Sequence, residues 1–166
     1  MVREKKYFTN LLFSIAVISF CFGLIVYTSQ SASSNPLSKT NMTPVRKNYP
    51  HLEEPVGPYV HAVKHNGFLF LSGITAFGSP AQNGTIAEQT DVVYSTMASI
   101  AEQENTDLSN LVKVTIYITS FDNVESLRAS LFKYYGSNLP ASSLVQVNRL
   151  FSPDLKIEVE AVIAVE

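Results

Sequence analysis

The chain has 166 residues, of which 46% are hydrophobic, and its 12 Lys and Arg against 14 Asp and Glu leave a net charge of −2. Once the first third of the chain is set aside, this length and composition are typical of one globular domain. There is no positive excess, and no cluster of Lys and Arg follows the basic N-terminal residues, so nucleic acid is excluded as an expected partner.

The N-terminal segment, residues 1–27, begins with basic residues and continues as an apolar run to its end. The length of this run lies between the core of a cleaved signal peptide and a full transmembrane helix. Both alternatives place the rest of the chain outside the cytoplasm, either periplasmic or secreted or anchored to the inner membrane, because the positive flank stays inside. Small residues at 31–33 offer a cleavage site, whereas a lipoprotein interpretation of Cys21 is weaker because bulky Phe20 precedes it.

Residues 28–54 are rich in Ser, Asn, Thr and Pro and show no apolar periodicity, which predicts a flexible linker. Residues 55–166 are predicted to be the folded domain. Because the only cysteine, Cys21, precedes this domain, it has no disulfide, no thiol nucleophile and no thiolate metal site.

The domain begins with two predicted strands, residues 60–63 and 68–72, joined by a short turn that contains Asn66 and Gly67. A polar loop follows and ends in a capping box, in which Thr85 and Glu88 satisfy free amides of a first helical turn. A helix is therefore predicted after Thr85, fading near residue 105.

Residues 111–118 alternate between two unlike faces, which predicts a strand. One face carries Val112, Val114, Ile116 and Ile118, and the other carries Lys113, Thr115 and Tyr117. A second helix is predicted to open at Asp122 and to stop at Gly136, and strands at 143–148 and 156–165 close the chain. The order β-β-α-β-α-β-β predicts an α/β (α+β) domain with one sheet and two helices on one of its faces.

The second face of this sheet has no helix to cover it. Along the last strand, Ile157, Val159, Ala161, Ile163 and Val165 are predicted to face the helices, and Glu158, Glu160, Val162 and Ala164 to face away. In the first hairpin, Phe68 and Phe70 add aromatic surface to one face of the sheet. Since a wholly solvent-facing sheet is more polar than this, we expect the second face to pack against other subunits.

A series of short motifs runs along the whole domain: Gly57-Pro58-Tyr59, Leu69-Phe70-Leu71-Ser72-Gly73, Leu111-Val112-Lys113-Val114-Thr115, Pro140-Ala141 and Ile157-Glu158-Val159-Glu160-Ala161. In these motifs the chain resembles the RidA/YjgF family of reactive intermediate deaminases. The resemblance implies a chorismate-mutase-like fold and a homotrimer in which three sheets form a central barrel. It also implies small-molecule clefts between subunits, where active members hydrolyse 2-imino acids to 2-keto acids and ammonia.

The resemblance assigns roles to five residues. Glu158 matches the family's acidic residue that positions the attacking water, a task that suits a general base. Tyr59 matches an aromatic residue of the cleft, and Ser72 and Gly73 match a loop whose small residues let backbone approach a ligand. Active members hold the substrate carboxylate with an Arg in Pro-Ala-Arg-Ser, but here Ser142 occupies that position. A hydroxyl has neither the charge nor the reach for a bidentate pair with a carboxylate.

No other residue replaces that arginine in an obvious way. Arg128 on the second helix and Arg149 after a strand are both interpreted as surface charges. The three histidines, His51, His61 and His65, lack the spacing of a metal site, so no metal and no cofactor are expected. His61 lies near Tyr59 in the sequence but is interpreted as an exposed hairpin histidine.

Three functions are consistent with these observations. The leading hypothesis is an extracytoplasmic trimer whose intersubunit cleft binds a small molecule and hydrolyses an imine or enamine to a carbonyl compound and ammonia. The alternative is a binding trimer that has kept the fold and lost the chemistry, and export slightly favours it because amino-acid-derived imines arise mostly in cytoplasmic metabolism. The third is a structural, membrane-tethered trimer.

Overall fold

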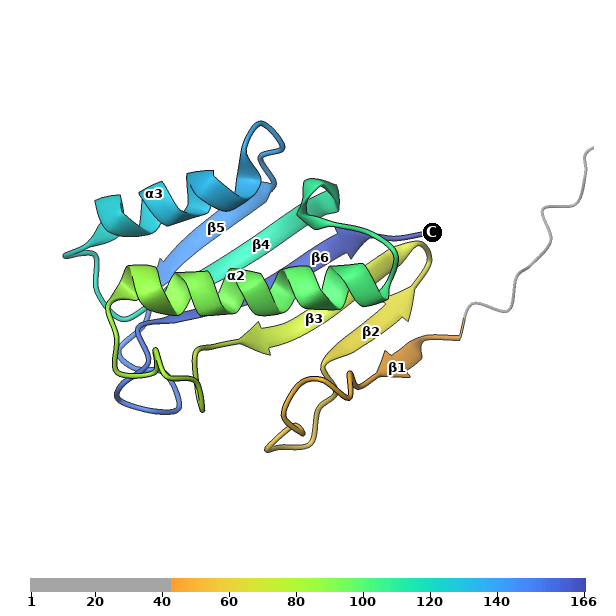
Figure 1. The fold of residues 1–166 in the computed structure, drawn as a ribbon, viewed down its shortest axis with the longest axis horizontal. Helices are drawn as coiled ribbons and strands as arrows, with labels where there is room; N and C mark the ends of the chain where they lie inside the picture. The colour runs from red at the N-terminus through yellow and green to blue at the C-terminus, as the bar shows by residue number, and fades with distance from the viewer. Residues whose placement is uncertain (1–42) are drawn as a thin grey trace, which may run out of the picture. The chain divides into compact units, whose positions relative to one another are not determined.

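A computed structural model describes residues 43–166, in which one six-stranded sheet carries two helices on one face (Figure 1). The strands are β1 (Val45–Lys47), β2 (Ala62–His65), β3 (Phe68–Ile74), β4 (Leu111–Ile118), β5 (Ala141–Gln146) and β6 (Ile157–Ala164). The helices are α2 (Ile86–Gln103) and α3 (Val124–Tyr135), and the 3-10 turn η1 (Leu108–Asn110) precedes β4. From β2 onward the elements follow the predicted order, which confirms the fold class.

The strands lie in the order β1-β2-β3-β6-β4-β5. All neighbours are antiparallel except β4 and β5, which are parallel and joined through α3. Consequently β6, the last strand of the chain, lies in the interior of the sheet, and β5 forms one edge. The predicted signal peptide or anchor, residues 1–27, lies outside the described residues. Within residues 43–166, no helix has the length and apolar character needed to span a membrane.

The sheet starts earlier than the predicted domain boundary at Pro55. The predicted linker, residues 28–54, is described from residue 43 onward, and there it contains β1, which pairs antiparallel with β2. Tyr49, just after β1, is buried. A three-residue strand is too short to show the alternation on which a sequence-based prediction depends, so its place in the sheet rests on long-range contacts.

The core lies between the sheet and the two helices. Along β6 and its end, every second residue from Ile157 to Val165 is buried, as the alternation predicted. Leu69 and Leu71 of β3 are also buried, whereas Phe68 and Phe70 between and beside them are 38% and 45% exposed. The sheet therefore has one apolar face under the helices and a second face with aromatic side chains that no element of residues 43–166 covers.

One predicted core residue, Val112, faces the wrong way: its side chain is 42% exposed. The reason is an irregularity in the pairing of β4 with β6. Leu111 lies opposite Ile163, but Lys113 already lies opposite Val162, so Val112 is an extra residue. Such a bulge reverses the alternation on its N-terminal side, and Leu111 is buried in place of Val112.

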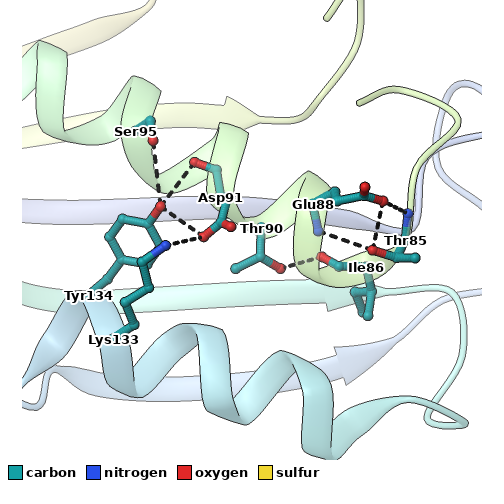
Figure 2. A network of polar contacts seen from close by, with 8 residues as sticks. All are labelled: Thr85, Ile86, Glu88, Thr90, Asp91, Ser95, Lys133 and Tyr134. Atoms are coloured by element: carbon teal, nitrogen blue, oxygen red, sulfur yellow. Dashed lines mark hydrogen bonds and ion pairs between the residues drawn. The ribbon is translucent and has the colours of Figure 1, made fainter. Parts of the chain in front are cut away.

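Polar contacts cap the start of α2 and also join α2 to α3 (Figure 2). The predicted capping box begins α2: the Thr85 hydroxyl accepts from the Glu88 amide, and the Glu88 carboxylate accepts from the Thr85 amide. One turn later Asp91 accepts hydrogen bonds from two residues of α3, the Tyr134 hydroxyl at 2.9 Å and the Lys133 ammonium at 3.1 Å. These contacts set the position of α3 against α2 over the sheet.

A buried carboxylate holds the N-terminal strand against the end of α2. Glu104 is 7% exposed and caps the C-terminus of α2. It accepts a hydrogen bond from the Tyr49 hydroxyl at 3.0 Å and forms ion pairs with Lys47 and Lys64. Burial alone raises the pKa of Glu104, but the hydrogen bonds from Lys47 and Tyr49 and the charges of both lysines outweigh it and hold that pKa below its usual value.

The first prediction concerns this carboxylate. Because its pKa is lower in the folded protein than in the unfolded chain, ionised Glu104 stabilises the fold above its unfolded pKa, and this stabilisation is lost as the pH falls through the folded pKa. Glu104→Gln should therefore lower the free energy of unfolding by about 1–3 kcal/mol near neutral pH, since it leaves two lysines beside an uncharged side chain. Urea unfolding of the full-length protein measures this difference.

The matched control is Glu102→Gln, an exposed glutamate on the same helix turn, which should change stability by less than about 0.5 kcal/mol. The loss in Glu104→Gln should shrink as the pH falls below the ordinary pKa of a glutamate and through the lower folded pKa of Glu104. An equal effect of the two substitutions would contradict the assigned role of Glu104.

Candidate functional site

A pocket of about 800 Å³ opens at the end of β3. One wall is the connection between β1 and β2, from His51 to His61, and another is the segment from Ser72 to Ser79, which ends β3 and leads toward α2. Side chains of α2, the Phe151 ring from the connection before β6, and Glu158 and Glu160 of β6 complete the lining.

The structure brings four of the five predicted site residues into this pocket: Tyr59, Ser72, Gly73 and Glu158. Tyr59 is 47% exposed, so its ring is available to a ligand. The Ser72 hydroxyl is already committed, because it donates to the Val60 carbonyl oxygen at 2.7 Å. Ser72 therefore holds the chain next to Tyr59 in position, and its hydroxyl does not point free into the pocket.

Gly73 and Glu158 are in direct contact. A Cβ atom added at Gly73 would overlap the Glu158 carboxylate, lying 2.9 Å from its carboxyl carbon. The pairing of β3 with β6 shifts register between Leu71 and Ile74, so the backbone at Gly73 is released from the regular ladder. Only a residue without a side chain allows the carboxylate to lie against the strand here. The family motif thus has a physical reason in this chain.

The electrostatic environment of Glu158 favours its protonated form. The Glu158 side chain is half-buried. It lies two residues before Glu160 in the sequence, so both side chains are on the same face of β6. Burial first, and then the negative charge of Glu160, raise the pKa of Glu158 above its ordinary value. A carboxylate with a raised pKa is better matched to accept and return a proton near neutral pH.

Glu160 has a partner of its own on the same face of the sheet. The Tyr117 hydroxyl donates to a Glu160 carboxylate oxygen at 3.3 Å. The charge of Glu160 is also the main reason why the pKa of Tyr117 is raised, so this hydroxyl keeps its proton and stays a donor. The pocket therefore contains two neighbouring carboxylates, of which Glu160 is hydrogen-bonded and Glu158 is not bonded to any side chain of residues 43–166.

Ser142, the fifth predicted site residue, is not in this pocket. It lies on the edge strand β5, which is separated from β3 by β4 and β6. In the parallel ladder Ser142 is opposite Val114, while its neighbour Ser143 accepts a hydrogen bond from the Lys113 ammonium at 2.7 Å. Within one chain, Ser142 and Glu158 therefore do not share a site.

The two arginines considered as substitutes also lie elsewhere. Arg128 forms an ion pair with Glu125 one turn away on α3, and both side chains are exposed. Arg149 is exposed and does not line the pocket. Neither arginine contributes a charge to the lining of the pocket in a single chain.

His61 lines the pocket together with Tyr59, and it is not the exposed hairpin side chain of the preferred interpretation. It is only partly exposed, its Nδ1 accepts from the Tyr49 backbone amide at 3.0 Å, and its Nε2 lies 2.9 Å from the Glu53 carbonyl oxygen. These two contacts require neutral histidine with the proton on Nε2. The ring therefore braces the connection that forms one wall of the pocket. Within residues 43–166, no group of His, Cys, Asp or Glu side chains is arranged to hold a metal ion.

Sequence reasoning missed the aromatic side of the pocket. Phe77 and Phe151 meet edge to face with ring centroids 4.9 Å apart, although they lie in different connections of the fold. The second of these connections is held against α2 by Gln89, which donates to the Asp154 carbonyl oxygen and accepts from the Lys156 amide. No local pattern in the sequence pairs two distant phenylalanines, so this contact depends on the tertiary structure.

Comparisons with known proteins agree with this architecture. The family model described as endoribonuclease L-PSP matches residues 51–165. A RutC family protein of Pyrococcus abyssi is 33% identical over 112 residues, which are 66% of this chain and 87% of that protein. The 2-iminobutanoate/2-iminopropanoate deaminase of Dermatophagoides farinae is 26% identical over 70% of this chain and 93% of its own length. A crystal structure from Thermotoga maritima is similar with a TM-score of 0.61 and 34% identity, over 67% of this chain and 89% of that one.

The second prediction follows from the raised pKa of Glu158. A raised pKa means that ionised Glu158 costs folding free energy, and this cost is absent below the unfolded pKa and appears as the pH rises through the folded pKa. Glu158→Gln removes the charge and should stabilise the protein at neutral pH, by less than about 1 kcal/mol because the side chain is half-exposed. The difference should vanish in acid. Thermal unfolding of both proteins across pH measures it, and a variant less stable at neutral than at acidic pH, relative to wild type, would contradict the prediction.

Proposed function

Because the chain belongs to the endoribonuclease L-PSP family, the RidA/YjgF family that its motifs resemble, we propose that it hydrolyses imines or enamines in a cleft between the subunits of a homotrimer. One observation carries the proposal: the Glu158 carboxylate lies against Gly73 in a pocket that raises its pKa. A relative named as a 2-iminobutanoate/2-iminopropanoate deaminase supports the type of reaction.

In the proposed reaction Glu158 accepts a proton from a water molecule while the water oxygen attacks the carbon of a C=N bond. The same proton passes to the nitrogen and gives a carbinolamine. The proton of its new hydroxyl group then passes through Glu158 to the nitrogen as the C–N bond breaks, and ammonia and a carbonyl compound leave. One water is consumed, and Glu158 ends the cycle in the state in which it began. A carboxylate with a raised pKa suits proton transfer in both directions, because a group whose pKa lies closer to the working pH can both accept a proton and return it.

The trimer is proposed from the uncovered face of the sheet. Four apolar side chains on three strands are between 38% and 45% exposed, namely Phe68, Phe70, Val112 and Val145. Isolated exposed apolar residues are common, but a group of them on a sheet face is typical of an interface. In a closed ring of three sheets, the edge strand β5 of one copy lies near the pocket of the next, which gives Ser142 a route into the site.

The second candidate is a binding trimer without catalytic activity, which Ser142 favours. The family's active members hold the substrate carboxylate with an arginine at this position, and no Lys or Arg of residues 43–166 lines the pocket. For either candidate we propose a position outside the cytoplasm, periplasmic, secreted or anchored to the inner membrane. This localisation rests on the basic start and apolar run of residues 1–27.

The third prediction tests the assembly. Light scattering of the full-length protein should return the mass of a trimer, and Phe70→Lys should reduce it, since a charge on the uncovered face would be buried in the ring. Phe132→Lys is the matched control, because Phe132 is 63% exposed on α3 and lies away from the sheet face. A monomer mass for the wild type at micromolar concentration would refute the trimer.

The fourth prediction tests the reaction. Wild-type activity on 2-iminobutanoate should be weak, and Ser142→Arg should raise kcat/KM by about tenfold or more, because a guanidinium adds a charge-assisted bond to the carboxylate. Ser137→Arg in the exposed loop before β5 is the control and should leave activity unchanged. Adding Glu158→Gln to Ser142→Arg should abolish the activity.

Each result separates the two candidates. If the Ser142→Arg trimer is well folded and inactive, the non-catalytic candidate is favoured. Strong wild-type activity that is insensitive to Ser142 would show that another group already binds the carboxylate.

A further inference from the structure

The pocket that contains Glu158 is acidic. Four carboxylates line it, and they are Glu53, Glu54, Glu158 and Glu160. No Lys or Arg is among its lining residues in the described part of the chain, and none of the four glutamates forms an ion pair there. Within residues 43–166, therefore, no ion pair with a Lys or Arg neutralises their charge.

Beside these carboxylates the lining has an apolar and aromatic part, together with Ser and Thr side chains and two histidines, His51 and His61. The edge-to-face pair Phe77 and Phe151 leaves both rings partly exposed, at 43% and 62%, and Tyr59 and Val56 add further exposed apolar surface. This combination is suited to a molecule that has an apolar, ring-sized group and a positive charge, because aromatic faces and carboxylates both attract cations.

A 2-imino acid anion is poorly matched to this lining. Its carboxylate would approach uncompensated negative charges in a partly desolvated site, where like charges repel strongly. Ser142, at the position where active members carry the carboxylate-binding arginine, supplies no cation. An imine without a carboxylate avoids this repulsion, and in its protonated iminium form it carries the charge that the pocket attracts.

We infer that the substrates are iminium cations derived from apolar primary amines, and not 2-imino acids. The inference rests on the proposed hydrolytic function and adds the charge and the apolar group of its substrate. The reaction keeps its balance: water adds to the carbon of the C=N bond, the nitrogen leaves as ammonium with the charge of the iminium ion, and the product is an aldehyde or ketone in place of a 2-keto acid.

The test compares two imines that differ only by one carboxylate. 2-Phenylethanimine is generated in place from phenethylamine by an amine oxidase, and 2-imino-3-phenylpropanoate from phenylalanine by an amino-acid oxidase. Imine that remains after a fixed time is trapped with semicarbazide, which gives kcat/KM for the full-length protein with each. We expect at least about a tenfold preference for the imine without a carboxylate, decreasing as salt is added.

Two variants assign the preference to the pocket. Glu160→Gln should reduce it by about threefold or more, since it removes one of the charges beside the substrate. Glu102→Gln, an exposed glutamate outside the pocket, should leave it unchanged. If Glu160→Gln does not fold, Glu53→Gln on the exposed connection serves the same purpose.

The outcomes separate this inference from the proposed function. A preference for 2-imino-3-phenylpropanoate would overturn the inference while the deaminase function stands. If neither imine is hydrolysed, the proposed function fails, and calorimetry then decides the inference from two stable probes. Tighter binding of phenethylammonium than of 3-phenylpropanoate would support the inferred preference of the pocket for cations over carboxylates, and equal or weaker binding would overturn that preference.

Discussion

The close contact between Glu158 and Gly73 is the constraint on which the site depends. It requires a register shift between β3 and β6, a residue without a side chain on β3, and a glutamate on the uncovered face of a strand inside the sheet. Each requirement comes from a different segment of the chain. Because the sheet provides rigid backbone on both sides, the carboxylate is held in a partly desolvated position that raises its pKa.

Two carboxylates of this domain have opposite pKa shifts, and the difference follows from their partners. Glu104 is more deeply buried, yet Lys47, Lys64 and Tyr49 stabilise its charge, and it fastens β1 to the end of α2. Among residues 43–166, Glu158 has no such partners, and the charge of a second carboxylate, Glu160, acts on it instead. The first arrangement stabilises the fold, whereas the second costs stability, and carboxylates of this second kind are common at functional sites.

The brace at Glu104 also reaches the pocket. It holds β1, and the connection that follows β1 is fixed by His61 through its contacts with the Tyr49 amide and the Glu53 carbonyl. That connection forms one wall of the pocket and carries Tyr59. The stability of the N-terminal strand and the shape of the proposed binding site are thus coupled through a short run of residues that carries no apolar pattern.

Sequence alone was sufficient for the order of elements from β2 onward, for the capping box that begins α2, and for the two faces of β6, because capping and alternation are local and repeat at known periods. It also identified Glu158 and Gly73 by resemblance, but not the contact between them. Tertiary structure decided the place of β1, the outward turn of Val112 at its bulge and the separation of Ser142 from the pocket. It also decided the meeting of Phe77 with Phe151. These features depend on contacts between segments far apart in the chain. Such contacts stabilise the fold without producing a periodic pattern in the sequence of either segment.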